Sequence, residues 1–306
     1  MTVYDTIRPL LPKGLVLANE PMSRHTSFKI GGPAEVYVTP ENTQQLATIW
    51  RACLRAGFPV TVLGDGCNVL VADAGIKGVV VVTSLMNRIE VEAPFITAGS
   101  GTKLARLAET ACKVGLTGME FASGIPATVG GAVYMNAGAF KYEIKDICES
   151  VEALLPDGMT INYPRDLLGF GYRASRFQNE NEIITAARFK LIPGDPAEIK
   201  AKMNNLNSSR RTTQPLDYPS AGSAFKRPAI EGYFAAKLID ENDLKGFAVG
   251  GAQVSEKHAG FIINRGNATA ADVLALMEAI QEKVYKSSGI WLEPEVQMLG
   301  FDTGTL

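Results

Sequence analysis

The chain has 306 residues, of which 46% are hydrophobic and 20% are charged, and its formal net charge at pH 7 is −2. The length predicts about two domains, and the composition is that of an ordinary globular protein. A net charge so close to zero gives no reason to expect a surface for nucleic acid or for an anionic membrane.

Cysteine and histidine are scarce, which limits the chemistry available to the side chains. Two histidines are too few for a multi-histidine metal centre, so we predict no metal site, and any redox chemistry would need an organic cofactor. The opening sequence, MTVYDTIRPLLPKG, is broken by proline and charge, unlike a signal peptide. No C-x-x-C pair occurs, which favours a reduced cytoplasmic compartment over a disulfide framework. The cysteines are Cys53, Cys67, Cys112 and Cys148.

The first part of the chain alternates helical and strand-like segments. An amphipathic helix is predicted between Thr39, which can cap it, and Gly57, which can end it. Strand-like runs are predicted at 58–66 and 78–85, and the second is apolar throughout, as in a strand covered on both faces. A second amphipathic helix is predicted over 102–115.

Residues 121–140, FASGIPATVGGAVYMNAGAF, carry no charge and are long enough to cross a bilayer. Four glycines and Pro126 argue against a helix of that length, since proline costs a helix interior about 3 kcal/mol. Polar groups such as Thr128 and Asn136 would not be satisfied by lipid. We therefore predict buried, irregular backbone made of small residues, a surface that lets a large flat group lie against the main chain.

The second part of the chain mixes strands and helices without a strict βαβ alternation, so we predict the α+β class. A polar helix within it links to a second region, and we place a domain boundary at 204/205. The predicted segments are a hairpin over 148–163, a strand over 182–192, the polar helix over 196–211, a helix over 269–289 with a Thr269/Asp272 capping box, and a strand over 289–299.

Two glycine pairs, Gly64-x-Gly66 and Gly99-x-Gly101, follow strand-like runs. Neither is followed by the third glycine of a dinucleotide fingerprint, so each alone is interpreted as a turn. Asn68 strengthens the first pair, because an amide just after a tight glycine turn can join backbone N–H groups around a diphosphate. No P-loop and no nucleophile elbow occurs.

Four polar stretches have both an ordinary and a functional interpretation. SAGSAFKRP (220–228) is either a surface turn or a loop with an accessible hydroxyl, and GYRASRF (171–177) holds either an arginine packed among aromatic rings or one aimed at an anion. LEPEV (292–296) is either a solvated edge strand or a pair of carboxylates on one face. Arg210-Arg211 is either a charged helix end or a phosphate clamp.

Taken in order, these motifs resemble one family, the UDP-N-acetylenolpyruvoylglucosamine reductases. The similarity runs from about residue 22 to about residue 300, and the short segment after GYRASRF resembles the family's shorter, type II form, which lacks an inserted tyrosine-bearing loop. The matching stretches are TSFKIGG, LGDGCNVLV, GMEFASGIPATVGGAVYMNAGA, GYRASRF, SAGSAFKRP and LEPEVQMLG.

The resemblance implies a vanillyl-alcohol-oxidase-like (PCMH-type) FAD-binding domain of two α+β subdomains over 1–204, and a C-terminal α+β substrate-binding domain over 205–306. It implies that NADPH, through FAD, reduces UDP-N-acetylglucosamine-enolpyruvate to UDP-N-acetylmuramate for peptidoglycan. We expect a cytoplasmic monomer with no nucleic-acid partner and no membrane span. The implied FAD-binding residues are Gly64, Asp65, Gly66, Cys67, Asn68, Gly124, Thr128, Gly130, Gly131, Asn136 and Gly138.

The resemblance also assigns the chemistry. Hydride addition to the enol ether builds negative charge on the substrate carboxylate and α carbon, and Arg173 matches the arginine that stabilises it. Ser223 matches the family's proton donor and Glu295 its catalytic glutamate, whereas Glu293 is interpreted as structural. Candidates for binding the UDP diphosphate are Lys226 and one of Arg210 and Arg211.

Two positions depart from the family pattern. Arg227 stands where asparagine is more common, and Cys67 replaces a commoner serine with a weak donor. Two rival functions remain open on the residues alone. One is a different oxidoreductase on the same flavin fold, such as an alcohol oxidase with a covalent flavin. The other is a nucleotide-sugar transferase or binding protein without flavin. The AGSAFK and LEPEV stretches favour the reductase.

Overall fold

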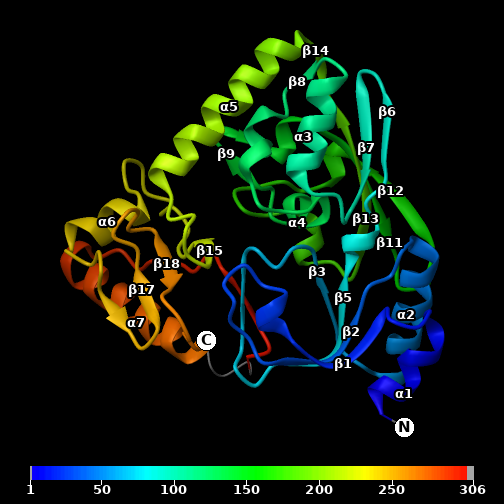
Figure 1. Ribbon diagram of the computed structural model, residues 1–306, viewed down its shortest axis with the longest axis horizontal. Coiled ribbons are helices and arrows are strands. Elements are labelled where there is room, and N and C mark those ends of the chain that lie inside the picture. The colour runs from blue at the N-terminus through cyan, green and yellow to red at the C-terminus, as the bar shows by residue number, and fades with distance from the viewer. Residues whose placement is uncertain (1, 302–306) are drawn as a thin grey trace. The chain divides into compact units, whose positions relative to one another are not determined.

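The computed structural model describes residues 2–301, and its contacts divide the chain into two compact units (Figure 1). The chain passes from unit 1 to unit 2 for the last time between Arg210 and Arg211, within helix α5 (Pro196–Thr213). The boundary predicted at 204/205 falls inside this helix, and the assignment of one function to each side of it stays a prediction. Unit 1 comprises Met1–Ala18, Glu35–Asp65 and Gly78–Arg210; unit 2 comprises Asn19–Ala34, Gly66–Lys77 and Arg211–Leu306.

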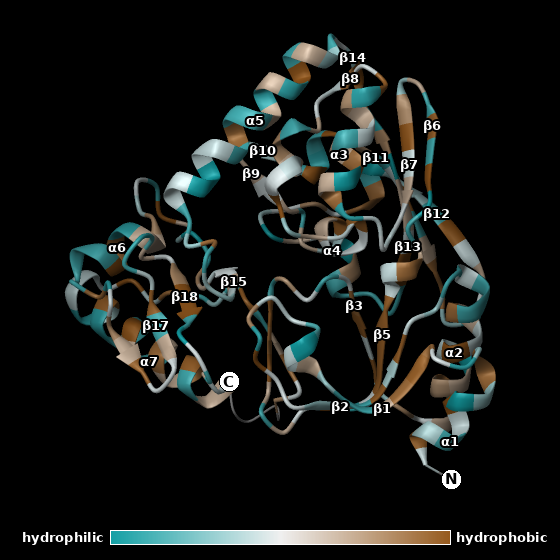
Figure 2. Cartoon of the chain, viewed as in Figure 1, coloured by the Kyte–Doolittle hydropathy of each residue, from teal (hydrophilic) through white to brown (hydrophobic). Residues whose placement is uncertain are grey.

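A four-stranded sheet in the order β1-β2-β5-β3 is built from the first part of the chain. Strand β5 runs brown along most of its length in Figure 2, as its apolar sequence predicts. Helix α2 buries Leu46, Ile49 and Trp50 in one cluster with the valines of β5. The elements are α1 (Val3–Ile7), β1 (Val16–Pro21), β2 (Pro33–Val38), α2 (Thr43–Ala56), β3 (Val60–Leu63) and β5 (Ile76–Val82).

Helix α2 begins later than predicted. The cap is Asn42 rather than Thr39: its Oδ1 accepts the N–H of Gln45 at 3.0 Å. The Gln45 side chain also accepts the N–H of Glu41 at 2.8 Å, so Gln45 bonds to two residues at the beginning of the helix, which favours Asn42 over Thr39 as the cap. Gly57 ends the helix with φ of 70°, as predicted.

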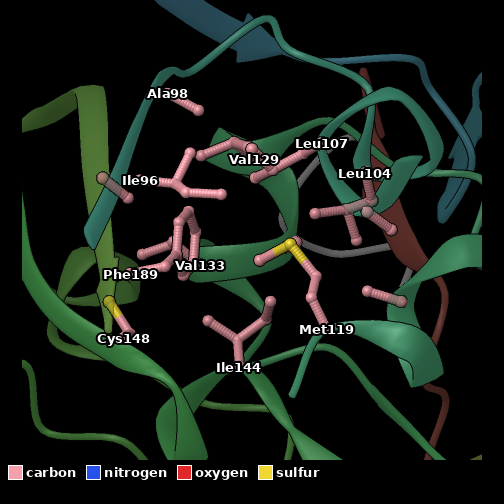
Figure 3. Close-up of a cluster of buried hydrophobic side chains, with 14 of the residues drawn as sticks. Ile96, Ala98, Leu104, Leu107, Met119, Val129, Val133, Ile144, Cys148 and Phe189 are labelled. Carbon is pink, nitrogen blue, oxygen red and sulfur yellow. The ribbon is translucent and has the colours of Figure 1, made fainter. Parts of the chain in front are cut away.

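A five-stranded antiparallel sheet forms the second layer of unit 1, in the order β12-β11-β13-β7-β6. The predicted hairpin is confirmed as β11 and β12. Figure 3 shows sheet residues Ile96 and Phe189 in one cluster with Leu107 of α3 and Val133 of α4. The elements are β6 (Ile89–Glu92), β7 (Phe95–Gly99), α3 (Leu104–Lys113), β11 (Cys148–Leu154), β12 (Thr160–Pro164) and β13 (Ile183–Lys190).

The prediction of buried, irregular backbone over 121–140 is only partly right: many of its residues are half-exposed, and the run contains the end of a 3₁₀ helix and a short helix, α4 (Val129–Tyr134). Thr128 caps α4, and the helix is only six residues long. Among the described residues, no helix has the length and apolar character needed to span a membrane. The short elements around the run are β8 (Leu116–Thr117), the 3₁₀ helix Glu120–Gly124, β9 (Gly138–Ala139), β10 (Tyr142–Glu143) and β14 (Ile192–Pro193).

Unit 2 packs helices α6 and α7 against a four-stranded antiparallel sheet, in the order β15-β18-β17-β16. The predicted capping box of α7, formed by Thr269 and Asp272, is confirmed. The predicted strand over 289–299 is reduced to β19, which pairs in parallel with β4. The elements are β4 (Val69–Val71), β15 (Ser220–Ser223), α6 (Ala235–Glu241), β16 (Ala248–Val249), β17 (Ala252–Val254), β18 (Phe261–Asn264), α7 (Ala270–Ser288) and β19 (Gln297–Leu299).

Candidate functional site

In unit 1, the first glycine turn lies against the run 121–140. A Cβ on Gly64 would collide with the Thr128 hydroxyl, so only glycine lets these two segments approach so closely. Lys103 forms a bridge with Thr128 and lies 3.6 Å from the carboxylate of Asp65. The structure therefore brings together Gly64, Asp65 and Thr128, three of the residues predicted to hold FAD.

The glycines of the run have different neighbours. A Cβ on Gly124 would lie 2.5 Å from the Asn207 amide oxygen, one on Gly130 would lie 3.0 Å from the Ser100 Cβ, and one on Gly138 would lie 2.6 Å from the Tyr142 carbonyl. The protein's own packing therefore accounts for these three glycines. Gly131 is different, because its Cβ would meet nothing closer than the Thr128 hydroxyl at 3.6 Å.

A flavin nucleotide fits this part of the run on two observations. The backbone at Gly131 is open to close approach, as contact with a flat ring requires. The Ser100 hydroxyl beside Gly130 is buried and has no hydrogen-bond partner among the described residues. A buried hydroxyl without a partner is costly, and a polar ligand can supply the missing bond.

Asn136 is fully buried and its amide is engaged by the protein. Its Nδ2 donates to the Gly171 carbonyl at 2.8 Å and to Glu143 at 3.1 Å, and its Oδ1 accepts the N–H of Lys145 at 2.9 Å. The backbone has φ of 42°, a region that asparagine tolerates better than most residues. Asn136 thus ties the end of the run to the stretch that carries Arg173, and its predicted contact with FAD stays a prediction.

Glu120 fixes the beginning of the run to helix α5. Glu120 is only 3% exposed. Its carboxylate accepts hydrogen bonds from the Thr117 hydroxyl at 2.5 Å and from the Gly118 N–H at 2.8 Å, and it lies 3.4 Å from the Nζ of Lys202. Burial alone would raise the pKa of Glu120. The hydrogen bonds and the Lys202 charge outweigh burial, so its pKa is held below the ordinary value of 4.5.

We expect Glu120→Gln to lower the free energy of unfolding at pH 7 by about 1–3 kcal/mol, since a buried hydrogen-bonded charge is lost. A depressed pKa stabilises the fold above the unfolded value, and this contribution disappears as the pH falls through the folded value. Denaturant unfolding at about pH 7 and at about pH 3 should show a larger difference at the higher pH.

Glu109→Gln is the matched control for that comparison. Glu109 also pairs with a lysine of α5, Lys200 at 2.7 Å, but its side chain is 38% exposed. Its loss should change the free energy of unfolding by no more than about 0.5 kcal/mol. Equal losses in the two variants would show that burial gives Glu120 no special weight.

Arg173 lies at the tip of a two-residue turn closed by an antiparallel bridge between Gly171 and Ala174. Its φ is 54°, a region that favours glycine or asparagine at this position of a turn. The guanidinium lies 4.9 Å from the ring centroid of Tyr172, which is 48% exposed. The turn thus holds a half-buried cation next to an exposed aromatic ring.

In unit 2, the second half of the predicted pyrophosphate loop is fixed by the backbone. The Gly66 carbonyl accepts the N–H of Ser27 at 3.1 Å. Asn68 donates its amide to the Glu295 carbonyl at 3.2 Å and accepts the N–H of Gln297 at 2.9 Å. Cys67 is partly exposed and forms no disulfide. Asn68 therefore links this loop to the predicted catalytic glutamate.

Ser223 and Glu295, which are 72 positions apart in the sequence, lie on neighbouring backbone stretches of unit 2. The N–H of Glu295 donates to the carbonyl of Ala224 at 2.9 Å, and Phe225 forms an antiparallel bridge with Pro294. A register shift between Ser220 and Ser223 interrupts the pairing of β15 just before the serine. Such bulges re-aim the side chain that follows.

A small apolar cavity of about 10 Å³ lies beneath this serine. Ala221, Gly222 and Ala224 line it with Met277 and Val296, and it is too small and apolar to hold a bound water. The residues on either side of Ser223 therefore face apolar core.

The predicted diphosphate-binding residues differ in environment. The Nζ of Lys226 lies 3.4 Å from the Glu293 carboxylate, and the backbone N–H of Lys226 donates to the Glu293 carbonyl at 2.8 Å. The structural interpretation of Glu293 stays a prediction. Arg210 lies beside Gly124 of the run: a Cβ on Gly124 would be 3.2 Å from the Arg210 Cδ. Burial lowers the pKa of Arg210. Arg211 belongs to unit 2 and is exposed.

Arg227, the departure from the family pattern, lies with its guanidinium 5.3 Å from the ring centroid of Phe234. This is within the range of a cation–π contact. Phe234 is itself 51% exposed, so the pair is at the surface of unit 2. The added charge is therefore held by an aromatic ring.

Two family models match the chain. One describes the C-terminal domain of UDP-N-acetylenolpyruvoylglucosamine reductase and matches residues 214–299; the other describes an FAD binding domain and matches residues 34–163. The chain is 47% identical over 298 residues to the UDP-N-acetylenolpyruvoylglucosamine reductase of Caldanaerobacter subterraneus subsp. tengcongensis, covering 97% of this chain and 98% of the relative. The chain belongs to the UDP-N-acetylenolpyruvoylglucosamine reductase family.

Other members of this reductase family are also similar to the chain over nearly its whole length. The UDP-N-acetylenolpyruvoylglucosamine reductase of Agathobacter rectalis is 46% identical, with 98% of each chain covered. The crystal structure of UDP-N-acetylenolpyruvylglucosamine reductase from Thermus caldophilus is 36% identical and superposes with a TM-score of 0.79, covering 93% of this chain and 98% of that one. The predicted α+β fold, with a PCMH-like FAD-binding domain and a C-terminal domain, is confirmed.

Sequence reasoning missed several residues around the reductase site. Lys103, Asn207 and Ser100 contact the predicted FAD segments. Lys103 and Asn207 stand in stretches without a distinctive pattern, and Ser100 lies inside the Gly99-x-Gly101 pair, which was interpreted as a turn. Gln178 was also missed, although it follows GYRASRF directly. The only available signal was its position next to a motif, and a single polar residue there has no defined role until its partners are known.

Proposed function

We propose that this protein reduces UDP-N-acetylglucosamine-enolpyruvate to UDP-N-acetylmuramate, a peptidoglycan precursor, with NADPH as the reductant and FAD as the cofactor. The observation that carries the proposal is the end-to-end match to named reductases, 47% identical over 97% of the chain. The pairing of the Ser223 stretch with the Glu295 stretch supports it, since the family's proton donor and glutamate would act on the same substrate group.

FAD would be held by the two glycine-rich segments. In unit 1, Gly64 and Asp65 would face the diphosphate while Gly131 and Thr128 would lie near the ring, with Ser100 as an additional hydrogen-bond donor. The first segment would be completed by Gly66, Cys67 and Asn68. The second would be completed by Gly124, Gly130, Asn136 and Gly138. When bound, FAD supplies the redox chemistry, namely a hydride accepted from NADPH and given to the enolpyruvyl double bond.

Three side chains would act on the enolpyruvyl group. Arg173 binds the substrate carboxylate and stabilises the negative charge that builds as hydride adds to the double bond. Ser223 gives its hydroxyl proton to the α carbon. Glu295 orients the carboxylate and the proton path. The hydride and the Ser223 proton together reduce the double bond, and the serine is reprotonated from solvent.

The UDP diphosphate would be bound by cations. Lys226 is the first candidate, because its side chain is 38% exposed and its ion pair, at 3.4 Å, is with Glu293, a surface carboxylate that a phosphate can replace. Of the two neighbouring arginines, Arg210 is favoured by its position beside Gly124 of the FAD segment. Arg211 is the alternative.

We infer a monomer in a reducing compartment, the cytoplasm, with small molecules as its partners and no nucleic acid. The four cysteines support the compartment, because none of them forms a disulfide and three are buried. Burial raises the pKa of Cys148 to about 12 and that of Cys53 to about 11, so these thiols are unreactive.

The visible spectrum of the purified protein under anaerobic conditions tests the proposal. Flavin bands that bleach with NADPH and return with UDP-N-acetylglucosamine-enolpyruvate would identify cofactor, donor and acceptor together. Bands that bleach and do not return would retain the flavin and discard the substrate, and a flavin that stays attached after denaturation would favour an alcohol oxidase. Protein that stays colourless after addition of FAD yet binds UDP-sugar would favour the non-redox alternative.

A further inference from the structure

The turn that carries Arg173 is strained at the arginine itself. Its φ of 54° lies in the left-handed region, which is unfavourable for a residue with a Cβ. The closing bridge bonds Gly171 and Ala174, at 3.0 and 3.3 Å, and leaves the carbonyl of Arg173 outside the ladder. Another group must therefore hold that peptide in place.

Gln178 supplies that group. Its Nε2 donates to the carbonyl of Arg173 at 3.0 Å and to the carbonyl of Tyr134 at 2.9 Å, and also lies 3.6 Å from the sulfur of Met135. Tyr134 is the last residue of α4, the helix inside the predicted flavin segment. One amide thus joins the peptide after the Arg173 side chain to the end of that helix.

The same helix end receives further bonds from the Arg173 stretch. The Ser175 hydroxyl donates to the carbonyl of Tyr134 at 2.8 Å, and Asn136 donates to the carbonyl of Gly171 at 2.8 Å. These bonds fix the two arms of the turn. The Gln178 bond acts on the Arg173 backbone itself, since it holds the carbonyl whose orientation depends on the strained φ and ψ of that residue.

We propose that Gln178 is a positioning residue for the reaction: its amide holds the backbone of Arg173 in the left-handed conformation and so sets where the guanidinium meets the substrate. The proposal rests on the proposed role of Arg173. Two carbonyl oxygens at hydrogen-bond distance require two donors on one atom, which glutamine supplies and glutamate does not. A small displacement of a charged group from its reacting position can cost about 10²-fold in rate.

Stopped-flow absorbance of the FAD-loaded enzyme tests the proposal with Gln178→Ala and Gln178→Glu. We expect reduction by NADPH to keep the wild-type rate, and reoxidation by the enolpyruvyl substrate to slow about 10- to 100-fold. Gln178→Glu keeps the shape but places a carboxylate against two carbonyl oxygens, so it should be at least as slow as Gln178→Ala. Gln178→Lys supplies donors again and should recover most of the rate.

Asn179→Ala is the matched control, because Asn179 is the next residue and is exposed. It should leave both half-reactions unchanged. Loss of flavin content, or equal slowing of both half-reactions in the Gln178 variants, would overturn the proposal in favour of a purely structural bond.

A double-mutant cycle separates this proposal from the role of Arg173. If Gln178 acts through the arginine, Gln178→Ala should have no further effect on reoxidation in an Arg173→Ala background. Additive effects would overturn the proposal while leaving Arg173 in its role. If Arg173→Ala alone leaves reoxidation at the wild-type rate, the role of Arg173 is wrong, and the role of Gln178 is wrong with it.

Discussion

Ser223→Ala is expected to leave reduction of the flavin by NADPH close to the wild-type rate and to slow its reoxidation by the enolpyruvyl substrate by about 10²- to 10⁴-fold. In the proposed mechanism the hydroxyl has no part in the first half-reaction. In the second, Ser223→Ala would leave the developing charge at the α carbon without the proposed proton donor. Stopped-flow absorbance of the flavin band measures the two half-reactions separately.

Ser220→Ala is the control for that substitution. Ser220 lies in the same strand, β15, but before the bulge that re-aims the backbone at Ser223. Its loss should leave both half-reactions near the wild-type rate. Ser223→Cys, which keeps a proton on a larger and more acidic group, should recover part of the reoxidation rate. Equal slowing of the two half-reactions in Ser223→Ala would remove the serine from its role.

The local parts of the fold could be predicted from the sequence. The β11–β12 hairpin has a Pro-Asp-Gly turn between strand-forming runs, and the Thr269/Asp272 capping box lies within four residues. The beginning of α2 was misplaced because Thr39 and Asn42 are both good caps. The choice between them depends on Gln45, which bonds to the Asn42 side chain through its N–H and to the N–H of Glu41 through its side chain. The capping preferences of single residues do not include such bonds.

The candidate site could be predicted only in part, because its geometry depends on contacts between distant segments. The sequence motifs identify Ser223 and Glu295, but their neighbouring positions follow from backbone pairing across 72 positions. Glycines were correctly recognised as sites of close approach. The sequence does not tell which of them admit a ligand, and Asn207, Ser100 and Tyr142 already fill the space beside three of the four in the run.

Arg173→Ala is expected to slow reoxidation of the flavin by the enolpyruvyl substrate by about 10²- to 10³-fold, the usual loss when a group that stabilises developing charge is removed. Arg173→Lys keeps a cation but loses the planar fork that matches a carboxylate, so its rate should lie between those of the wild type and Arg173→Ala. Reduction by NADPH should not change in either variant. Stopped-flow measurement of both half-reactions decides the assignment, and unchanged reoxidation in Arg173→Ala would contradict it.

Arg173→Gly adds a stability measurement to the same position. Glycine accepts a φ of 54° without the clash that a Cβ meets, so the free energy of unfolding should be no lower than that of the wild type, although activity is lost. If Arg173 has its proposed role, an arginine at a position that favours glycine is a case in which function opposes local stability. If Arg173→Gly unfolds more easily than the wild type, the arginine stabilises the turn, and the strain argued for this position is not present.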